Sequence, residues 1–303
     1  MSASRNIVAV VVTYHPKLDM LAHLLAVLEG QVDSIVIVDN GSGVALSSWF
    51  QARGKRNEHL IPLTTNLGIA AAQNIGMSRA RERSPDYLLL LDQDSCPAPD
   101  MVERLSAAAA KLQNDGRHLA AVGPRYLDER QNNPPPFIRI QGLRVRRQAC
   151  THDEDVVAVD YLVASGCLIP MATLDAVGGM VEGLFIDYVD IEWGLRAQYL
   201  GYQSYGVCAA MMSHSLGEQP INFFGRQIPL HSPLRHYYHF RNAVWLYRQS
   251  WLPLNWKLVD AWRLLLKYGF YSLFARPRLA HIKMMSLGLW QGLGKRMGRF
   301  DGS

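Results

Sequence analysis

Hydrophobic residues near the N-terminus follow the pattern of a parallel β-sheet connected by helices. Residues 7–12 form a continuous apolar run rich in β-branched side chains, as in a strand buried on both faces. Apolar residues recur at helical spacing over residues 18–28, and a second apolar run over residues 34–38 ends in the turn sequence Asp39-Asn40-Gly41-Ser42. A strand, a helix and a strand within about thirty residues predict a βαβ unit, which is typical of nucleotide-binding α/β folds.

Two more strands continue this alternation. Residues 60–63 predict a third strand, and an alanine-rich helix follows Asn66-Leu67-Gly68 and ends at Arg83. The fourth strand, residues 87–91, is the most apolar and runs directly into Asp92-Gln93-Asp94. The whole pattern predicts an α/β fold with a Rossmann-like, mostly parallel sheet flanked by helices.

The rest of the chain is less regular. Its patterns predict a helix over residues 101–112, a strand or hairpin over 139–147, a strand over 156–162 and a helix over 187–200. From Arg235 onward aromatic and basic residues interleave, with helices that break at Pro253 and Pro277. We therefore predict one α/β domain over residues 1–215 and a C-terminal helical region over residues 216–303.

Composition narrows the picture only slightly. The net charge of +5 suits nucleic acid, an anionic membrane surface or a phosphate-bearing substrate, and it selects none of them. The N-terminus has no signal-peptide pattern, and we expect no spanning helix and a cytoplasmic protein. The cysteines show no CxxC spacing, and we expect reduced, mostly buried thiols at Cys96, Cys150, Cys167 and Cys208.

Asp92-Gln93-Asp94 is the first candidate for chemistry. Ligands of an open parallel sheet bind beyond the carboxyl ends of its strands, where these carboxylates stand. Hard oxygen ligands suit Mg²⁺ or Mn²⁺, which would bridge diphosphate oxygens and stabilise a leaving group. A solvated acidic turn is the alternative, because this tripeptide alone is common.

Three further polar positions follow strand ends or helix starts. Asp39 ends the second strand, where a carboxylate can bind a base or ribose; turn capping explains it almost equally well. Asn66, Gly68, Asn74 and Gly76 lie across a loop and a helix start, which suits phosphate binding but also ordinary packing.

The predicted helix over residues 187–200 begins with several acidic residues. Asp187 and Asp190 are spaced to share one helix face, and Glu192 is spaced to point elsewhere. A carboxylate here can take a proton from a hydroxyl, although acidic residues at a helix start also stabilise its dipole.

Basic and imidazole side chains complete the candidate set. His214 can ligate the same metal, although a lone histidine is more often structural. Arg235 and Arg241 can neutralise a diphosphate or lie on a helix surface.

Taken together, these segments resemble inverting family 2 glycosyltransferases with the GT-A fold, and more narrowly their bacterial rhamnosyltransferases. The resemblance covers essentially the whole chain. The segments that carry it are Val12-Thr13-Tyr14, Val38-Asp39-Asn40-Gly41-Ser42, Asn66-Leu67-Gly68-Ile69-Ala70, Leu91-Asp92-Gln93-Asp94-Ser95, Ser165-Gly166-Cys167-Leu168, Phe185-Ile186-Asp187-Tyr188-Val189-Asp190, His214 and Arg235-His236-Tyr237-Tyr238-His239-Phe240-Arg241-Asn242.

The resemblance implies a single displacement at the anomeric carbon of a nucleotide-sugar. Asp92 and Asp94 would lie at the metal and diphosphate, with His214 as a possible further ligand. Thr13, Tyr14 and Asp39 would line the nucleoside pocket. Asp190 matches the family's general base, but Val189 stands where an acidic residue is commoner, so Asp187 could share that role. The Gln93 form of the motif and the arginine–tyrosine run near Arg241 suggest dTDP-rhamnose as donor, with UDP- or GDP-linked sugars as alternatives.

The expected acceptor is a hydroxyl of a cell-surface glycan or glycolipid. The basic, aromatic C-terminal region suits peripheral contact with the inner membrane, or ordinary packing on the sheet. A haloacid-dehalogenase-type phosphatase is a rival, but that class places its Asp-x-Asp on the first strand. Nucleic-acid binding is a second rival, which the scattered basic residues do not favour.

Overall fold

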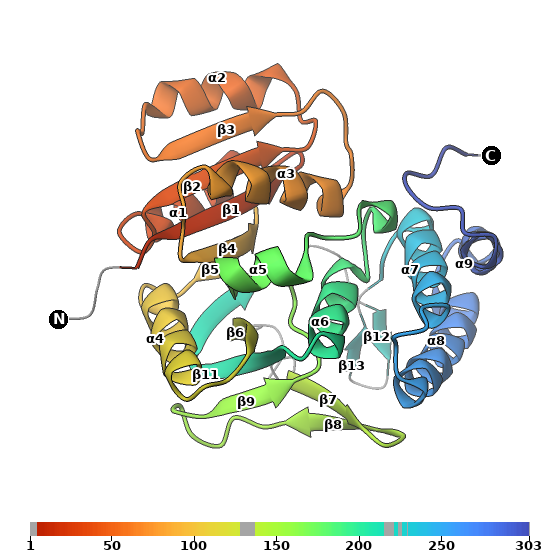
Figure 1. Ribbon diagram of the computed structural model, residues 1–303. Helices are drawn as coiled ribbons and strands as arrows, with labels where there is room; N and C mark the ends of the chain where they lie inside the picture. The colour runs from red at the N-terminus through yellow and green to blue at the C-terminus, as the bar shows by residue number, and fades with distance from the viewer. Residues whose placement is uncertain (1–4, 128–136, 215–220, 224–225, 229, 303) are drawn as a thin grey trace.

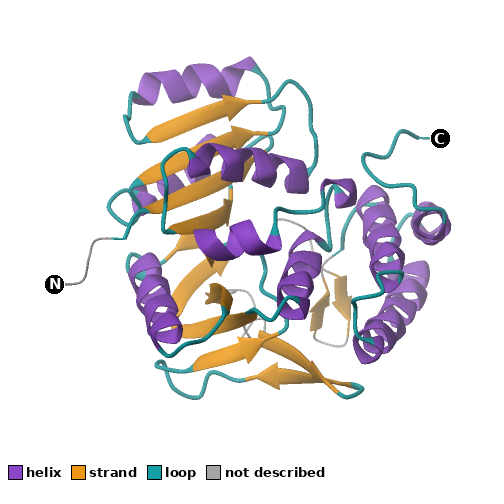
Figure 2. Ribbon diagram, viewed as in Figure 1, coloured by secondary structure: helices purple, strands orange, loops and turns teal. Residues whose placement is uncertain are grey.

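The computed structural model describes residues 5–127, 137–214, 221–223, 226–228 and 230–302. A twisted sheet forms the centre of the molecule, helices cover both of its faces, and the C-terminal helices lie beside it (Figures 1 and 2). The predicted α/β class with a large, mostly parallel sheet is therefore confirmed.

The first part of the chain alternates strands and helices as the sequence predicts. Its elements are β1 (Ile7–Thr13), α1 (Leu18–Leu28), β2 (Ser34–Asp39), α2 (Val44–Arg53), β3 (Glu58–Pro62), α3 (Ile69–Arg81), β4 (Tyr87–Asp92), β5 (Ser95–Pro97) and α4 (Met101–Asn114). The helix α2 was missed, because its apolar residues show no clear helical stripe.

The later part is mixed. Its elements are β6 (Leu119–Leu127), β7 (Phe137–Gln141), β8 (Arg144–Gln148), β9 (Val156–Val159), β10 (Cys167–Pro170), α5 (Met171–Val177), the 3₁₀ turn η1 (Glu182–Leu184), α6 (Val189–Tyr199), β11 (Gln203–His214), β12 (Ile221–Phe223), β13 (Arg226–Ile228), α7 (Pro233–Tyr247), α8 (Leu254–Phe274) and α9 (Arg278–Leu293). The basic segment forms the β7–β8 hairpin, and the C-terminal helices break at the two expected prolines.

Parallel pairing of β1, β2 and β4 decides where the site lies. The strand order is β3-β2-β1-β4-β10-β6-β11-β5, with β9 beside β11. In register, Thr13 pairs with Asp39 and Val12 pairs with Asp92. The carboxyl ends of three strands therefore meet at one edge of the sheet. Next to them, β10 runs antiparallel to β4.

Alternate residues of the buried strands build two cores, one on each face of the sheet. Ala9, Val11, Ile35 and Leu89 belong to the core that α1 and α4 cover. Val8, Val10, Val36 and Leu88 belong to the core that α3, α5 and α6 cover. These runs are apolar on both faces because helices cover both faces, which is what their continuous hydrophobicity predicts.

The expectation of four reduced cysteines is wrong for two of them. Cys150 and Cys208 form a disulfide across 58 residues of sequence, with their Cα atoms 5.6 Å apart. The pairing of β9 with β11 brings them together, since Val156 lies opposite Val207 and Cys208 N–H donates to Asp155 O. Such a long-range pair leaves no spacing signature. Cys96 and Cys167 are free thiols.

The C-terminal helices pack on the α/β part through a third apolar cluster. Tyr188 and Leu195 lie in this cluster together with Phe240, Trp256 and Met285.

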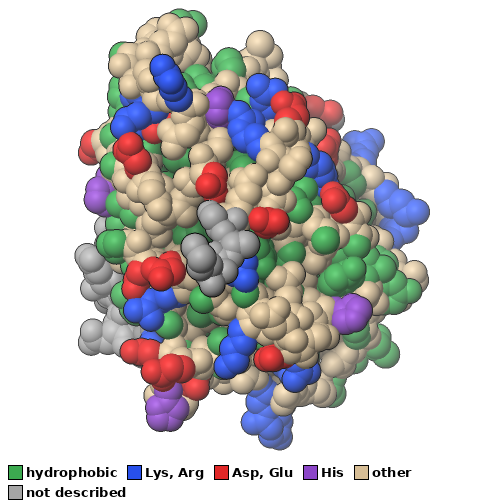
Figure 3. Space-filling view, turned by 60° about the vertical axis from the view of Figure 1, so that its left-hand side comes forward, with side chains coloured by type: hydrophobic (Ala, Val, Ile, Leu, Met, Phe, Trp, Pro, Cys, Tyr) green, Lys and Arg blue, Asp and Glu red, His purple; other side chains and the backbone are tan. Residues whose placement is uncertain are grey.

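The division at residue 215 remains a prediction. Within the described residues, no helix is long and apolar enough to cross a membrane. Figure 3 shows a different face of the molecule, where acidic and basic side chains are mixed.

Gly76 supplies a test of the packing between α3 and the sheet. A Cβ on Gly76 would lie 2.3 Å from Val10 Cγ1, whereas a Cβ on Gly269, in the middle of α8, meets nothing within 4 Å. We expect Gly76→Ala to lower the free energy of unfolding by about 1–3 kcal/mol. Gly269→Ala should leave it unchanged or raise it by up to about 1 kcal/mol. Urea unfolding checks both, and equal effects would contradict the packing.

Candidate active site

A cavity of ≈ 410 Å³ opens where the carboxyl end of β4 faces α6 and α7. Asp92, Asp187 and Asp190 line it, together with Gln73 and Arg235. The structure thus brings three of the sequence-predicted acidic residues to one cavity.

The Asp92-Gln93-Asp94 turn is fixed on two sides. Asp92 N–H donates to the hydroxyls of Ser95 (3.1 Å) and Ser165 (3.2 Å). The Gln93 amide pairs with the backbone of Tyr14, accepting from its N–H at 2.6 Å and donating to its carbonyl at 3.2 Å. Gln93 therefore ties the end of β1 to the Asp92–Asp94 turn, and Tyr14 stays half-exposed.

These residues suit a divalent ion whose remaining ligands are the oxygens of a bound diphosphate. Mg²⁺ is usually held by one or two carboxylates together with phosphate oxygens, not by a cage of protein ligands. Asp92 and Asp94 supply two carboxylates on one turn, and no group of three or more metal-binding side chains occurs among the described residues. His214 lies near the turn because its backbone pairs with Ser95; its side chain lies outside what the structure describes.

Asp39 shows the capping contacts of a turn. Its carboxylate accepts from Thr13 Oγ1 (3.2 Å), from Ser42 N–H (3.1 Å) and from the Ser42 hydroxyl. The residue is only 1% exposed. The contacts that Asp39 and Thr13 make are therefore with the protein itself, at the sheet edge where the nucleoside pocket was predicted.

Asn66, Gly68 and Asn74 connect this edge to the segment before α6. Asn66 Oδ1 accepts from Gly68 N–H, and a Cβ on Gly68 would lie 2.6 Å from the Phe185 carbonyl oxygen. Asn74 exchanges hydrogen bonds with the backbone of Met180 in both directions. Gly68 and Asn74 thus act in packing, and neither lines the cavity.

The segment that carries Asp187 is not helical, contrary to the sequence prediction. α6 begins at Val189, and Phe185, Asp187 and Tyr188 have φ of 66°, 62° and 64°. Ile186 N–H donates to Leu184 O, which closes a γ-turn around Phe185. Asp187 and Asp190 therefore do not share a helix face. Each such backbone conformation costs on the order of 1–3 kcal/mol and persists only when its surroundings hold it.

Arg241 and Asn242 of α7 hold this segment. Asn242 Nδ2 lies 2.7–2.9 Å from the carbonyl oxygens of residues 184, 186 and 187. Arg241 donates to the carbonyls of residues 183, 184 and 298, and it is 1% exposed. The prediction that Arg241 binds the diphosphate is incompatible with this burial, because its guanidinium is enclosed and bonded to backbone.

Asp190 has the environment of a base. It lies in the first turn of α6, and burial, as the largest cause, raises the pKa of its carboxyl to about 6, with the Asp187 carboxylate adding to the rise. The N–H groups of Ile191 and Ala164 oppose this shift by donating to the charged form. Asp187 forms an ion pair with Arg235, with Oδ1 3.3 Å from Nη2. The two acids therefore have distinct partners.

Gln73 is a candidate that sequence reasoning missed. It lines the cavity, is 4% exposed, and its Oε1 has no hydrogen-bond partner among the described residues. A buried amide oxygen without a partner costs about 1–3 kcal/mol, unless a ligand supplies the donor. One feature of the sequence could have pointed to Gln73. It is a long polar side chain that lies on the same face of α3 as the apolar residues Met77 and Ala80.

Comparison with known proteins gives this site a family. The model of the family "Glycosyl transferase family 2" matches residues 9–158. The chain is 34% identical over 251 residues to dTDP-rhamnosyl transferase RfbF of Shigella flexneri, covering 82% of each chain. It therefore belongs to glycosyl transferase family 2 and is a glycosyltransferase, so the phosphatase and nucleic-acid-binding rivals fall away.

Other relatives agree with this family. The chain is 25% identical over 304 residues to galactofuranosyltransferase GlfT1 of Mycolicibacterium smegmatis, covering 93% of this chain and 95% of that one. The fold is similar to that of S. aureus TarS 1-349 in complex with UDP-GlcNAc (TM-score 0.59, 15% identity, 95% of this chain and 81% of that one). GalNAc-T7 with UDP, GalNAc and Mn²⁺ also matches (TM-score 0.63, 12% identity, 97% and 57%). The predicted GT-A fold is confirmed.

The contacts of Asn242 predict a combined loss of stability and activity. Asn242→Ala leaves buried carbonyls without donors, so we expect the free energy of unfolding to fall by about 1–3 kcal/mol. The rate of glycosyl transfer should fall further than the folded fraction accounts for, because Asp187 and Asp190 lose their support. Asn255→Ala is the control, since Asn255 donates to a single exposed carbonyl, that of Gly142. A variant with full turnover would contradict this role.

Proposed function

We propose that the protein transfers a rhamnosyl group from dTDP-L-rhamnose to a hydroxyl of a cell-surface glycan or glycolipid such as lipopolysaccharide, with inversion and with Asp190 as the general base. One observation carries this proposal: Asp190, with its pKa raised to about 6, lines the same cavity as Asp92 at the end of β4. A carboxyl with that pKa is ionised at neutral pH and is a stronger proton acceptor than an ordinary aspartate.

In the proposed reaction, the acceptor hydroxyl gives its proton to the Asp190 carboxylate. The acceptor oxygen forms a bond to the anomeric carbon while the bond from that carbon to the diphosphate oxygen breaks, and dTDP leaves with the electron pair. Partial burial of Asp190 reduces the hydration of its carboxylate, and the turn after β4 lies where the leaving diphosphate is expected.

A divalent ion, Mg²⁺ or Mn²⁺, would be held by Asp92 and Asp94, with His214 as a further ligand. When bound, it would neutralise negative charge on the diphosphate. Arg235 would assist from the opposite wall of the cavity, because its guanidinium lines the cavity beside Asp187.

The choice of dTDP-rhamnose rests on the similarity to the Shigella enzyme, whose name states that donor. Tyr14 and Gln93, which bind one another through the Tyr14 backbone, stand where the base and diphosphate would meet. Gln73 Oε1 would accept a hydrogen bond from a hydroxyl of the donor sugar. UDP- and GDP-linked sugars are the alternatives.

Asp190→Asn tests the base directly. We expect transfer from dTDP-rhamnose to fall by about 10²–10⁴-fold, with the affinity for dTDP-rhamnose largely unchanged. In the native enzyme kcat should fall as the pH drops through about 6, because protonation removes the base and its pKa is raised, not lowered. Rates of dTDP release from pH 4.5 to 8 check both.

Asp187→Asn is the matched control. It should keep an acid limb, shifted somewhat below pH 6, because burial still raises the pKa of Asp190 while the Asp187 carboxylate no longer adds to the rise. If Asp190→Asn retains strong turnover and Asp187→Asn does not, Asp187 is the base. Transfer from UDP-sugars with none from dTDP-rhamnose would contradict the donor and leave the base in place.

We also propose that the C-terminal helices contact an anionic membrane surface, such as the cytoplasmic face of the inner membrane. Leu254, Leu258, Trp262 and Leu265 are each more than half exposed, and their spacing places them on one face of α8. Residues 216–303 contain 13 Lys and Arg residues and 3 Asp and Glu residues. An apolar stripe on a strongly basic region suits an anionic lipid interface.

Trp262→Glu tests this contact. We expect about tenfold weaker co-sedimentation with phosphatidylglycerol-containing vesicles, since a buried aromatic contributes roughly 1.5–3 kcal/mol. Val44→Glu is the control, because Val44 is also a largely exposed apolar residue but lies on α2. Unchanged binding of the Trp262 variant, or equal binding to neutral phosphatidylcholine vesicles, would contradict the proposal.

A further inference from the structure

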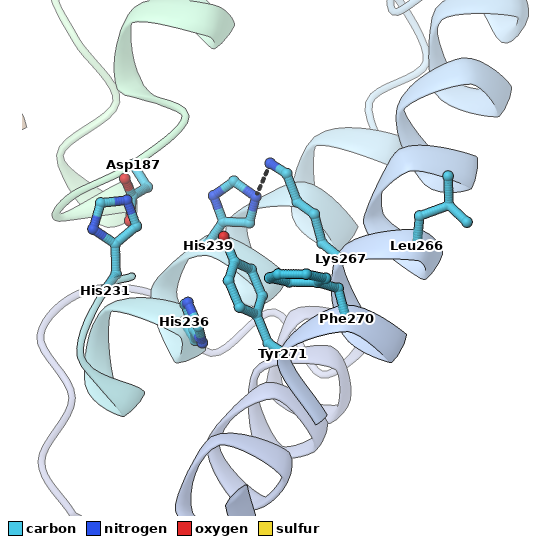
Figure 4. Close-up of a pocket in the computed structure, with 8 residues that line it drawn as sticks. All are labelled: Asp187, His231, His236, His239, Leu266, Lys267, Phe270 and Tyr271. Carbon is cyan, nitrogen blue, oxygen red and sulfur yellow. Dashed lines mark hydrogen bonds between the residues drawn. The ribbon is translucent and has the colours of Figure 1, made fainter. Parts of the chain in front are cut away.

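A second pocket of ≈ 450 Å³ lies between α7 and α8. Asp187 lies on one side of it, Lys267, Phe270 and Tyr271 of α8 on the other, and His236 and His239 of α7 between them (Figure 4). Asp187 and His239 also line the candidate active site. The two spaces therefore share a wall, and a molecule in the second pocket would lie beside Asp187, close in sequence to Asp190.

A chain of hydrogen bonds fixes the protonation of His236. His281 Nε2 lies 3.3 Å from the carbonyl oxygen of Arg276, which can only accept, so this nitrogen carries the proton. Burial lowers the pKa of both His281 and His236, so both rings are neutral. His281 Nδ1 is then an acceptor, and His236 Nδ1 donates to it at 2.9 Å. His236 Nε2 is consequently left as a bare acceptor.

This acceptor has no partner within the described part of the chain. His236 is 2% exposed, and its Nε2 makes no hydrogen bond there. A buried acceptor without a donor costs about 1–3 kcal/mol, which a ligand can recover by donating a proton. The missing partner is thus a hydrogen-bond donor that enters the pocket.

The other walls favour a neutral hydroxyl compound as that donor. An anion would meet the Asp187 carboxylate and the lone pair of His236 Nε2, and a cation would meet the ammonium group of Lys267. Lys267 Nζ lies 2.9 Å from His239 Nε2 and keeps further N–H groups for a ligand oxygen. Phe270 and Tyr271 supply apolar surface. A few polar groups on an aromatic wall are typical of a small-molecule site.

We propose that this pocket is the acceptor subsite and holds a saccharide, one hydroxyl of which donates to His236 Nε2 while another accepts from Lys267. The inference rests on the proposed function, because it assigns the glycan that receives the transferred sugar. It adds that a sugar ring of the acceptor, not its lipid or phosphate portion, is recognised here.

Saturation-transfer NMR with simple methyl glycosides tests the subsite. The probes are the methyl pyranosides of L-rhamnose, D-glucose, D-galactose and N-acetyl-D-glucosamine. Each is added to the full chain in a buffer that contains Mg²⁺ and dTDP but no Mn²⁺. We expect at least one to bind the native protein. His236→Phe, which removes the acceptor, should weaken that probe about three- to tenfold. His236→Gln, which restores an amide oxygen, should recover most of the affinity.

A second variant tests the pocket without changing a buried residue, in case the His236 variants do not fold. Leu266 lines the pocket and is 55% exposed, so Leu266→Trp should fill the pocket without disturbing the core and should abolish probe binding. Binding of every probe unchanged in both variants, or no probe bound by the native protein, would overturn the subsite. Hydrolysis of dTDP-rhamnose by water is measured for the same proteins in separate samples without dTDP. No hydrolysis by the native protein marks failure of the proposed function. Hydrolysis that survives in the Leu266 variant separates the acceptor subsite from the donor site.

Discussion

The site depends on the hydrogen bonds from Arg241 and Asn242 to the backbone of residues 183–187. That segment contains the positive φ angles of Phe185, Asp187 and Tyr188, which an isolated chain would not retain. Gly68 packs against it from the sheet side, and the Tyr188 hydroxyl donates to Asp260 of α8 at 2.7 Å. Helices that follow the α/β part therefore give residues 183–188 their shape, so the geometry of the candidate site depends on both parts of the chain.

With residues 183–187 held in this conformation, the three acidic residues of the cavity lie in different environments. Asp92 stands at the open end of β4 beside a polar turn, where an ion and a diphosphate can reach it. Asp190 is only partly exposed, and burial raises the pKa of its carboxyl to about 6. Asp187 is paired with Arg235 and divides the cavity from the pocket on α7 and α8. Aspartates of the same cavity thus differ in hydration, charge and partners because their environments differ.

The sequence predicted most of what local pattern controls. The apolar runs predicted β1, β2 and β4, and they put Asp39 and Asp92 at the ends of two of these strands. The structure adds that both residues share one sheet edge with Thr13. Features that depend on distant contacts could not be predicted in this way. The prediction that Arg241 binds the diphosphate is wrong because the burial of Arg241 depends on backbone carbonyls about 57 residues away. Local sequence pattern carries no signal for such contacts. The prediction of a helix that begins at Asp187 is wrong because the γ-turn around Phe185 has no local sequence signature. The Cys150–Cys208 disulfide was missed because it depends on the pairing of β9 with β11.

The proposed function requires the Asp92–Asp94 turn and Asp190 to lie on opposite sides of the anomeric carbon of the bound donor. The most direct measurement is a crystal structure of Asp190→Asn with dTDP-rhamnose and Mn²⁺, with the ion located by its anomalous signal. The account predicts a manganese peak between the Asp92–Asp94 turn and the diphosphate, with residue 190 facing the anomeric carbon on the side away from the leaving oxygen. A diphosphate bound elsewhere, or residue 190 on the same side as the leaving oxygen, would contradict it.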